Sequence, residues 1–125
     1  MELLIKKCAK CGSVVQVLHD CDCVGDCGIK CCGENLITLK ANTTDGAVEK
    51  HVPEYTINDG FVEVVVNHVM EEDHYIEWIA AVYDKKICTK YLNPGEDAKA
   101  KFKYKEGMVL YAYCNKHLLW KKEVK

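Results

Sequence analysis

The chain has 125 residues and a formal net charge of −2, and all 17 of its basic side chains are lysines. Hydrophobic residues make up 49% of the sequence, enough for the core of one domain or of a small domain beside a medium one. A near-neutral chain without arginine lacks the basic surface and the bidentate side chains of nucleic-acid-binding proteins, so we exclude nucleic acid as a partner.

The apolar runs are too short to cross a membrane, so we expect no membrane association. The opening segment carries an acidic residue first and only a brief apolar stretch, unlike a signal peptide, so we expect a cytoplasmic protein. Seven of the nine cysteines lie between Cys8 and Cys32. Because the cytosol keeps thiols reduced, this density indicates metal binding rather than disulfides.

Residues 1–38 are rich in cysteine and glycine and hold few large apolar side chains, so this segment needs a structural metal to fold. Cys8 and Cys11 form a Cys-x-x-Cys-Gly knuckle, and Cys31 and Cys32 form a second pair that also precedes a glycine. Four thiolates arranged as a tetrahedron suit zinc or iron, and their spacing does not distinguish the two metals. We therefore expect a four-cysteine metal module over 1–38.

Three further cysteines, Cys21, Cys23 and Cys27, lie between the two pairs. They are spare thiols, alternative ligands of the metal, or a pair able to form a disulfide, and the sequence leaves these roles open. Taken alone, the segment is also compatible with a structural zinc ribbon that has no redox function.

From residue 39 to residue 125 the hydrophobic pattern changes to a period of two, which is typical of half-buried strands. The predicted strands cover 61–66, 75–83, 87–92, 98–105 and 108–114, with turn signals between them. We find no helical stretch in this half. The pattern predicts an immunoglobulin-like β-sandwich of about seven strands, so the fold class is mainly β.

Four of the five histidines lie in this second half. His68 leaves one predicted strand and His74 enters the next, so hairpin geometry would bring both to one rim of the sandwich. Cys114 and His117 end another strand, and their spacing lets both side chains face one centre. Together with His51 they provide four imidazoles and one thiolate. Zinc sites close at four ligands, whereas five such donors suit iron.

These motifs resemble those of the desulfoferrodoxins, the two-iron form of superoxide reductase, over nearly the whole chain. The first part is similar to the desulforedoxin module of the rubredoxin type, through Cys8-x-x-Cys11-Gly and Cys31-Cys32-Gly-Glu. The second part is similar to the neelaredoxin domain. Its motifs are Glu49-Lys50-His51-Val52-Pro53, His68-x-Met70-Glu71-Glu72-x-His74-x-Ile76-Glu77-Trp78 and Cys114-Asn115-x-His117.

The resemblance implies two iron ions per chain. The catalytic iron would be bound by His51, His68, His74 and His117, with Cys114 as the axial ligand and His117 coordinating through Nδ1. The second iron, or a zinc ion in its place, would be bound by Cys8, Cys11, Cys31 and Cys32. The loop that carries Cys21, Cys23 and Cys27 is longer than in the family, which leaves open which four thiolates hold this second metal.

The activity implied by the resemblance is the one-electron reduction of superoxide to hydrogen peroxide without production of O₂. The electron would come from an external donor such as a rubredoxin, and the family often forms homodimers through the N-terminal module. Lys50 directly precedes a ligand, where its ammonium would attract the anion and stabilise the developing peroxide charge. Glu49 resembles the family's carboxylate that occupies the sixth position of oxidised iron. The simpler interpretation of both is a solvated charge pair.

Two other functions compete with this one. An electron carrier would join a tetrathiolate iron module to an inactive β-sandwich and would hold one iron. An interaction protein would join a zinc ribbon to a binding domain and would scatter its histidines over the surface. The grouping of histidines in motifs with Cys114 argues against both. We expect Trp78 and Trp120 to be core residues or to cover the site.

Overall fold

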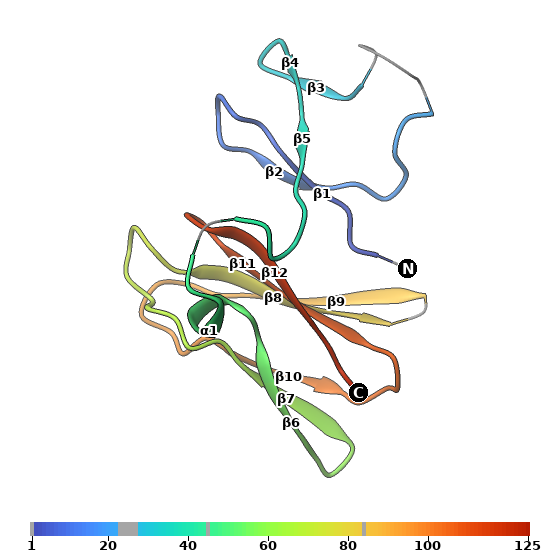
Figure 1. Ribbon diagram of the computed structural model, residues 1–125, viewed down its shortest axis with the longest axis vertical. Coiled ribbons are helices and arrows are strands. Elements are labelled where there is room, and N and C mark those ends of the chain that lie inside the picture. Colours follow the sequence, from blue (N-terminus) through green and yellow to red (C-terminus); the bar gives the residue numbers. More distant parts are fainter. Residues whose placement is uncertain (1, 23–27, 45, 84) are drawn as a thin grey trace. The chain divides into compact units, whose positions relative to one another are not determined.

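The computed structural model describes residues 2–22, 28–44, 46–83 and 85–125. The chain divides into two compact units, 2–40 and 41–125, and strands dominate both of them (Figure 1). The one helix within the described ranges, α1 (Val48–His51), is a single turn. The fold is therefore mainly β, as predicted. No helix in the part of the chain that is described is long and apolar enough to cross a membrane.

The N-terminal unit is built from five very short strands. They are β1 (Ile5–Lys7), β2 (Val14–Gln16), β3 (Lys30–Cys31), β4 (Glu34–Asn35) and β5 (Ile37–Thr38). β1 is the centre of a three-stranded antiparallel sheet in the order β2-β1-β5, and β3 pairs with β4. Lys6 in β1 is buried, and its ammonium lies 3.0 Å from the carboxylate of Asp20. Strands of two or three residues cannot build a large core. The unit therefore needs further stabilising interactions, such as ion pairs or a bound metal.

The second unit contains seven strands in two antiparallel sheets, and this confirms the predicted β-sandwich. One sheet has the order β10-β7-β6 and the other has the order β12-β11-β8-β9. The strands are β6 (Glu54–Asn58), β7 (Phe61–Val65), β8 (Ile76–Tyr83), β9 (Lys86–Tyr91), β10 (Lys99–Lys103), β11 (Val109–Cys114) and β12 (Leu118–Glu123). The five strands expected from the sequence all form, with ends within two residues of those predicted. β6 and β12 are additional.

The core of the sandwich lies between the two sheets, and every strand that borders it turns alternate residues inward. Val62 and Val64 from β7 meet Ile79 from β8 and Leu110 from β11, and each of these side chains is at most 1% exposed. Burial of this kind contributes about 1.5–3 kcal/mol for each large aliphatic side chain. The core therefore fixes the positions of the strand ends.

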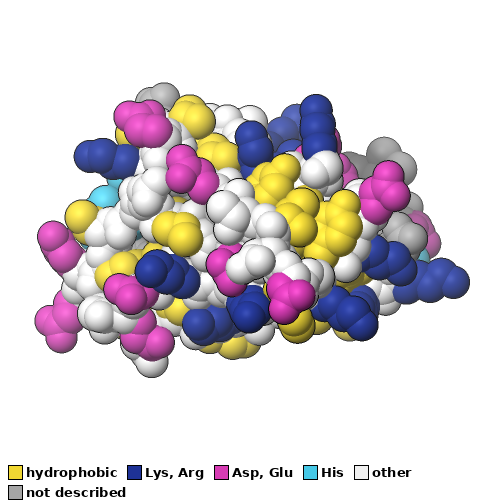
Figure 2. Space-filling view, turned by 90° about the horizontal axis from the view of Figure 1, so that it is seen from below, with side chains coloured by type: hydrophobic (Ala, Val, Ile, Leu, Met, Phe, Trp, Pro, Cys, Tyr) yellow, Lys and Arg dark blue, Asp and Glu magenta, His cyan; other side chains and the backbone are white. Residues whose placement is uncertain are grey.

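The strand β10 shows the predicted alternation most clearly. Ala100 and Phe102 are buried, whereas Lys99, Lys101 and Lys103 are exposed. β10 lies at the edge of its sheet, where charged side chains discourage pairing with another strand. On the face presented in Figure 2, lysines, acidic residues and apolar side chains are interspersed rather than separated by sign.

The connection from β7 to β8 differs from the hairpin expected between His68 and His74. The two strands belong to different sheets, so this connection crosses from one sheet to the other. A tight turn within it joins Glu71 and His74 by two backbone hydrogen bonds of 3.0 and 3.2 Å. The expectation of a hairpin was wrong because the spacing of two strands in the sequence does not reveal whether they share a sheet.

We expect a large effect of truncating Ile79, which is fully buried in β8, an inner strand of its sheet. Ile79→Ala should lower the free energy of unfolding by about 2–5 kcal/mol, since it leaves a cavity between the sheets. Chemical denaturation of the metal-loaded chain measures the change. Lys122→Ala, an exposed substitution in β12, is the control, and equal destabilisation by both variants would contradict this account of the core.

Candidate metal centre

His51 is the last residue of α1 and is only 3% exposed. The helix ends there because Val52 precedes Pro53 and adopts an extended backbone, as residues before proline do. The Nδ1 atom of His51 lies 2.7 Å from the carbonyl oxygen of Ala47. A carbonyl can only accept a hydrogen bond, so Nδ1 carries the proton and Nε2 keeps its lone pair.

His68 and His74 lie on the connection between the two sheets. The Nδ1 atom of His68 lies 2.6 Å from the carbonyl oxygen of Val69, so its lone pair is also on Nε2. The Nε2 atom of His74 is buried and has no hydrogen-bond partner in the described part of the chain. Buried polar atoms are normally satisfied, and such an orphaned nitrogen is expected where an ion binds.

Cys114 is the last residue of β11, and His117 lies in the turn between β11 and β12. The pairing of β11 with β8 shifts register between Tyr113 and Cys114, which brings Cys114 opposite Ile76 and into the core. Bulges of this kind redirect side chains next to functional sites. The backbone N–H of His117 donates to the Cys114 sulfur over 3.4 Å, so the turn itself holds the sulfur in place.

Asn115 joins this turn to the segment that carries His74. Its side-chain oxygen accepts the backbone N–H of Tyr75 at 3.0 Å, and its side-chain nitrogen donates to the carbonyl oxygen of Asp73 at 2.9 Å. The sequence analysis assigned no role to Asn115. Its position between Cys114 and His117 in the sequence is the feature that could have predicted this role.

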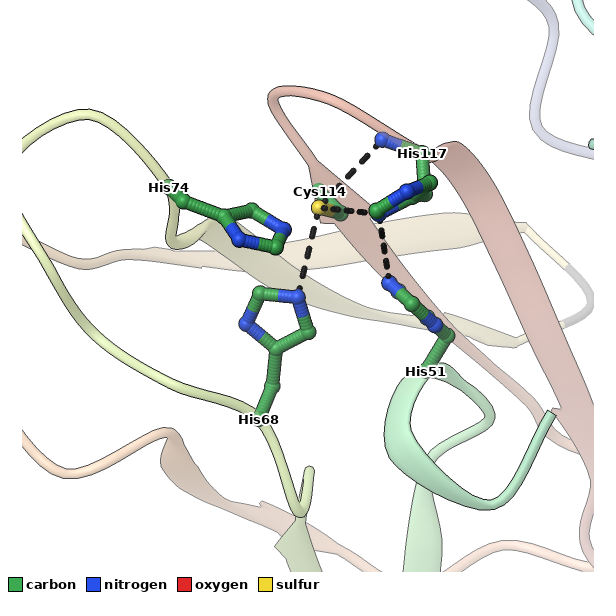
Figure 3. Close-up of side chains that lie close together, drawn as sticks. All are labelled: His51, His68, His74, Cys114 and His117. Carbon is green, nitrogen blue, oxygen red and sulfur yellow. Dashed lines mark hydrogen bonds between the residues drawn. The ribbon is translucent and has the colours of Figure 1, made fainter. Parts of the chain in front are cut away.

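Four imidazoles and one sulfur converge at this end of the sandwich (Figure 3). One ligand atom from each side chain can be chosen so that all five lie within 4.8 Å of one another; the side chains are His51, His68, His74, Cys114 and His117. The Nε2 atom of His51 is 3.0 Å from the Nδ1 atom of His117, and the Cys114 sulfur is 3.4 Å from the Nε2 atom of His68.

These distances fit ligands around one ion. Two nitrogens bound at about 2.1 Å lie about 3.0 Å apart when the angle between their bonds is a right angle, and about 3.4 Å apart in a tetrahedron. The separation of 3.0 Å between His51 and His117 agrees with the right angle. Five donors in such an arrangement suit iron, which accepts both imidazole and thiolate. The residues present therefore fit an iron ion.

Burial favours the neutral form of the imidazoles, which is the form that binds a cation. It lowers the pKa of His51, His68 and His74, and the neighbouring imidazoles lower each pKa further, so these rings stay neutral and keep their lone pairs. Burial raises the pKa of the Cys114 thiol, although the backbone N–H groups of His117 and Lys116 lower it. A bound cation reverses this effect of burial, because a coordinating thiol loses its proton.

Glu49 and Lys50 lie on α1 directly before His51, and both side chains are exposed. Lys50 and His68 line a groove of about 640 Å³, which also includes Val69 and Lys99. The charge of Lys50 helps to lower the pKa of His68, and that of Glu49 opposes the lowering at His51. Both charges therefore influence the pKa values of clustered histidines, although neither side chain is among the five donors.

The N-terminal unit contains a second group of donors formed by Cys8, Cys11, Cys31 and Cys32. The sulfur of Cys31 lies 3.6 Å from that of Cys11 and 3.9 Å from that of Cys32. Sulfurs bound at about 2.3 Å in a tetrahedron lie about 3.8 Å apart, so these separations fit one metal ion. All four residues are thiols rather than disulfides.

Local backbone geometry explains why the four sulfurs meet. Gly12 has a φ of +79°, which turns the chain after Cys11, and the N–H of Cys11 faces the Cys8 sulfur at 3.5 Å. Cys32 and Gly33, with φ of 53° and 77°, form the turn between β3 and β4. Two successive residues with positive φ are typical of a two-residue hairpin turn. The predicted knuckles are thus present.

A serine that the sequence analysis did not consider touches this cluster. Its hydroxyl lies 3.1 Å from the Cys11 sulfur, and this contact with Ser13 lowers the pKa of Cys11 to about 6. Shared hydrogen bonds with Cys11, and then with Cys8, raise the pKa of Cys31 to about 12. The hydroxyl of Ser13 therefore favours the thiolate form of Cys11.

Of the three extra cysteines, Cys21 lies within the described residues. Among the described residues Cys21 is exposed and is not part of the four-cysteine group. Cys23 and Cys27 lie outside the described residues, so the roles considered for them remain open.

The contacts of Asn115 predict a role in metal affinity. Asn115→Ala removes both links to the His74 segment and should weaken iron binding at the five-residue centre by about 10-fold to 100-fold, the usual effect of losing a group that orients ligands. Competition with a ferrous chelator measures the affinity. Asn58→Ala, at the end of β6, is the control, and equal affinity in Asn115→Ala and wild type would contradict the assignment.

Comparison with known proteins shows the family of this chain. Residues 43–123 match the family model described as desulfoferrodoxin. The chain is 46% identical to a desulfoferrodoxin of Nitratidesulfovibrio vulgaris, over 95% of this chain and 94% of that protein. The crystal structure of a superoxide reductase from Treponema pallidum is 25% identical with a TM-score of 0.71, and the match covers 98% of this chain and 99% of that one. The chain therefore belongs to the desulfoferrodoxin family.

Proposed function

We propose that the protein is a superoxide reductase, which reduces superoxide to hydrogen peroxide by one electron without producing O₂. The observation that carries the proposal is the convergence of four imidazoles and one cysteine sulfur beside an exposed lysine. The relatives named desulfoferrodoxin and the superoxide reductase of similar fold support it. An iron(II) ion held by these five donors would supply the electron and an open coordination position.

Cys114 provides the only anionic donor of the set. A negative ligand stabilises the higher charge of an oxidised metal, so it favours donating an electron to superoxide over accepting one from it. This preference is the physical basis for a reductase rather than a dismutase. The hydrogen bond from the backbone of His117 limits how much of the sulfur's charge is available, and so adjusts the preference.

Lys50 is proposed to attract superoxide and to stabilise the charge of the developing peroxide. Since the whole chain carries a net charge of −2, its overall field does not favour an anion. The face shown in Figure 2 also has mixed charges. Lys50 and Lys99 both line the groove beside His68, and the charge of Lys50 also acts on His68 itself. The ammonium of Lys50 would therefore contribute much of the local attraction.

Forming hydrogen peroxide from superoxide takes one electron and two protons, and both protons come most directly from water. His68, His74 and His117 are only partly buried, so solvent reaches this side of the centre. Rapid protonation favours the release of peroxide over cleavage of its O–O bond. Glu49, exposed beside Lys50, is proposed to compete for the open position in the oxidised protein and to leave on reduction.

The remaining assignments form part of the same proposal. Residues 1–38 would be the desulforedoxin-like module with a second iron, or with zinc, and residues 39–125 the catalytic domain. Tetrahedral sulfur separations and the hydroxyl of Ser13 support a metal of either kind. An external electron donor such as a rubredoxin, a homodimer through the N-terminal module and a cytoplasmic location complete the proposal.

The alternative of an electron carrier with an inactive β-sandwich explains the cysteine cluster alone. It gives no reason for a buried histidine nitrogen without a partner or for five donors around one point. The alternative of an interaction protein required histidines scattered over the surface. Four of them instead lie together.

Metal analysis with visible spectroscopy tests the proposed function. We expect iron at the five-residue centre, a thiolate-to-iron absorption band that appears on oxidation, and rapid reaction of the reduced protein with superoxide. Cys114→Ser should lose the band and the activity and keep its fold, measured by circular dichroism. A reduced wild-type protein that contains this iron but does not consume superoxide would refute the function.

Removing the charge of Lys50 should slow the reaction. We expect Lys50→Ala to react with superoxide about tenfold more slowly at low ionic strength, with a weaker dependence on salt, because the local attraction is lost. Pulse radiolysis over a range of ionic strengths measures both quantities. Lys122→Ala is the matched control. If Lys50→Ala retains the salt dependence of the wild type, another group steers the anion.

A further inference from the structure

Trp120 in β12 touches two of the four histidines in different ways. Its indole ring stacks on the imidazole of His51, with ring centroids 4.8 Å apart and planes inclined by 21°. Its N–H donates a hydrogen bond of 2.8 Å to the backbone carbonyl oxygen of His117. Trp120 itself is 1% exposed, so the surrounding core fixes its position.

Gly46 touches the same two histidines from the loop before α1. A Cβ atom at this position would lie 3.2 Å from Cε1 of His51 and 3.3 Å from Cγ of His117. Both separations are tighter than most Cβ contacts, so a larger residue at this position would require one of the two rings to shift. Gly46 and Trp120 therefore confine the same pair of rings from two separate segments.

The nitrogens of these two rings form the shortest distance in the centre. The Nε2 atom of His51 and the Nδ1 atom of His117 are 3.0 Å apart, which corresponds to neighbouring ligands at a right angle. The hydrogen bond to Ala47 fixes the tautomer of His51, but it leaves the ring free to tilt about that bond. A stacked neighbour removes this freedom because tilting breaks the face-to-face contact.

We infer that Trp120 is a positioning residue of the metal centre, which with Gly46 holds His51 and His117 at the right-angle separation. The inference rests on the proposed iron site and extends it beyond the ligands. Trp120 does not touch substrate; it acts through the two rings. Its second effect is to keep water from His51, which is the most buried of the four clustered histidines.

Trp78 offers a matched control in the same sheet. It stacks on Tyr113 with ring centroids 5.5 Å apart and pairs with it across β8 and β11. Trp120 pairs with Ala112, the residue before Tyr113. Neighbouring residues of a strand point to opposite faces, so the two tryptophans lie on opposite faces of the sheet. Removing Trp78 should disturb the sheet without disturbing His51.

The test compares iron release and the spectrum of the oxidised centre in the full chain. Iron released to a ferrous chelator is measured over time. The kinetic phase that is absent from Cys114→Ser is assigned to the five-residue centre. Trp120→Leu should release this iron about 10-fold faster or more and shift the thiolate-to-iron band, as expected when a residue that orients ligands is lost. Trp120→Phe retains a stacked ring and should release iron more slowly than Trp120→Leu. Trp78→Leu should resemble the wild type in both measurements.

Gly46→Ala provides an independent perturbation outside the core. It should shift the same band, because the added methyl group must displace His51 or His117. If Trp120→Leu and Gly46→Ala keep the band and the release rate of the wild type, or if Trp78→Leu changes both as much as Trp120→Leu does, the positioning role is refuted. A wild-type chain without iron at this centre would overturn the proposed function and this inference with it.

Discussion

The second unit depends on bringing the donor atoms of four imidazoles and one thiol together at one partly buried end of the sandwich. The Nε2 atom of His51 faces the Nδ1 atom of His117 at 3.0 Å, and the Cys114 sulfur faces the Nε2 atom of His68 at 3.4 Å. The Nε2 atom of His74 has no hydrogen-bond partner among the described residues. Leaving a buried polar group unsatisfied costs about 1–3 kcal/mol. A cation at the centre would remove this cost, so metal binding and the stability of the rim are coupled.

The β-sandwich provides this arrangement by bringing separate segments to one end. α1 carries His51, and the connection between the sheets carries His68 and His74. The end of β11 carries Cys114, and the turn after it carries His117. Each segment is short and has little structure of its own. The bulge beside Cys114 and the hydrogen bonds of Asn115 connect them to the rigid strands. The precision of the centre therefore comes from the sheets rather than from the loops.

Much of this organisation was predictable because it has local signatures. The alternation of Lys99, Ala100, Lys101 and Phe102 predicted β10. The two donor sets were implied by the resemblance of their motifs to those of a family. β6 escaped prediction because it is an edge strand whose residues are mostly exposed, so burial imposes no pattern on it. β12 begins with an apolar run and ends in charges, and α1 is too short for a helical period.

Contacts between distant residues explain the other differences. Only the sheet order shows that β7 and β8 lie in different sheets, and no spacing predicts that Asn115 bonds to the backbone of Tyr75. Trp120 was expected to be a core residue or to cover the site, and it does both: it is buried and stacks on His51. Its hydrogen bond to His117 had no counterpart in the sequence pattern.

The two sides of the centre have different surroundings, and the proposed chemistry needs both. His51 lies against Trp120 with little contact with water, which favours fixed ligand geometry. His68 borders the groove that holds Lys50, where an anion can approach and protons are available. A fully buried centre would exclude superoxide and delay protonation, whereas a fully exposed one would let water displace the ligands. A rim that is dry behind His51 and open beside His68 meets both requirements with the same set of side chains.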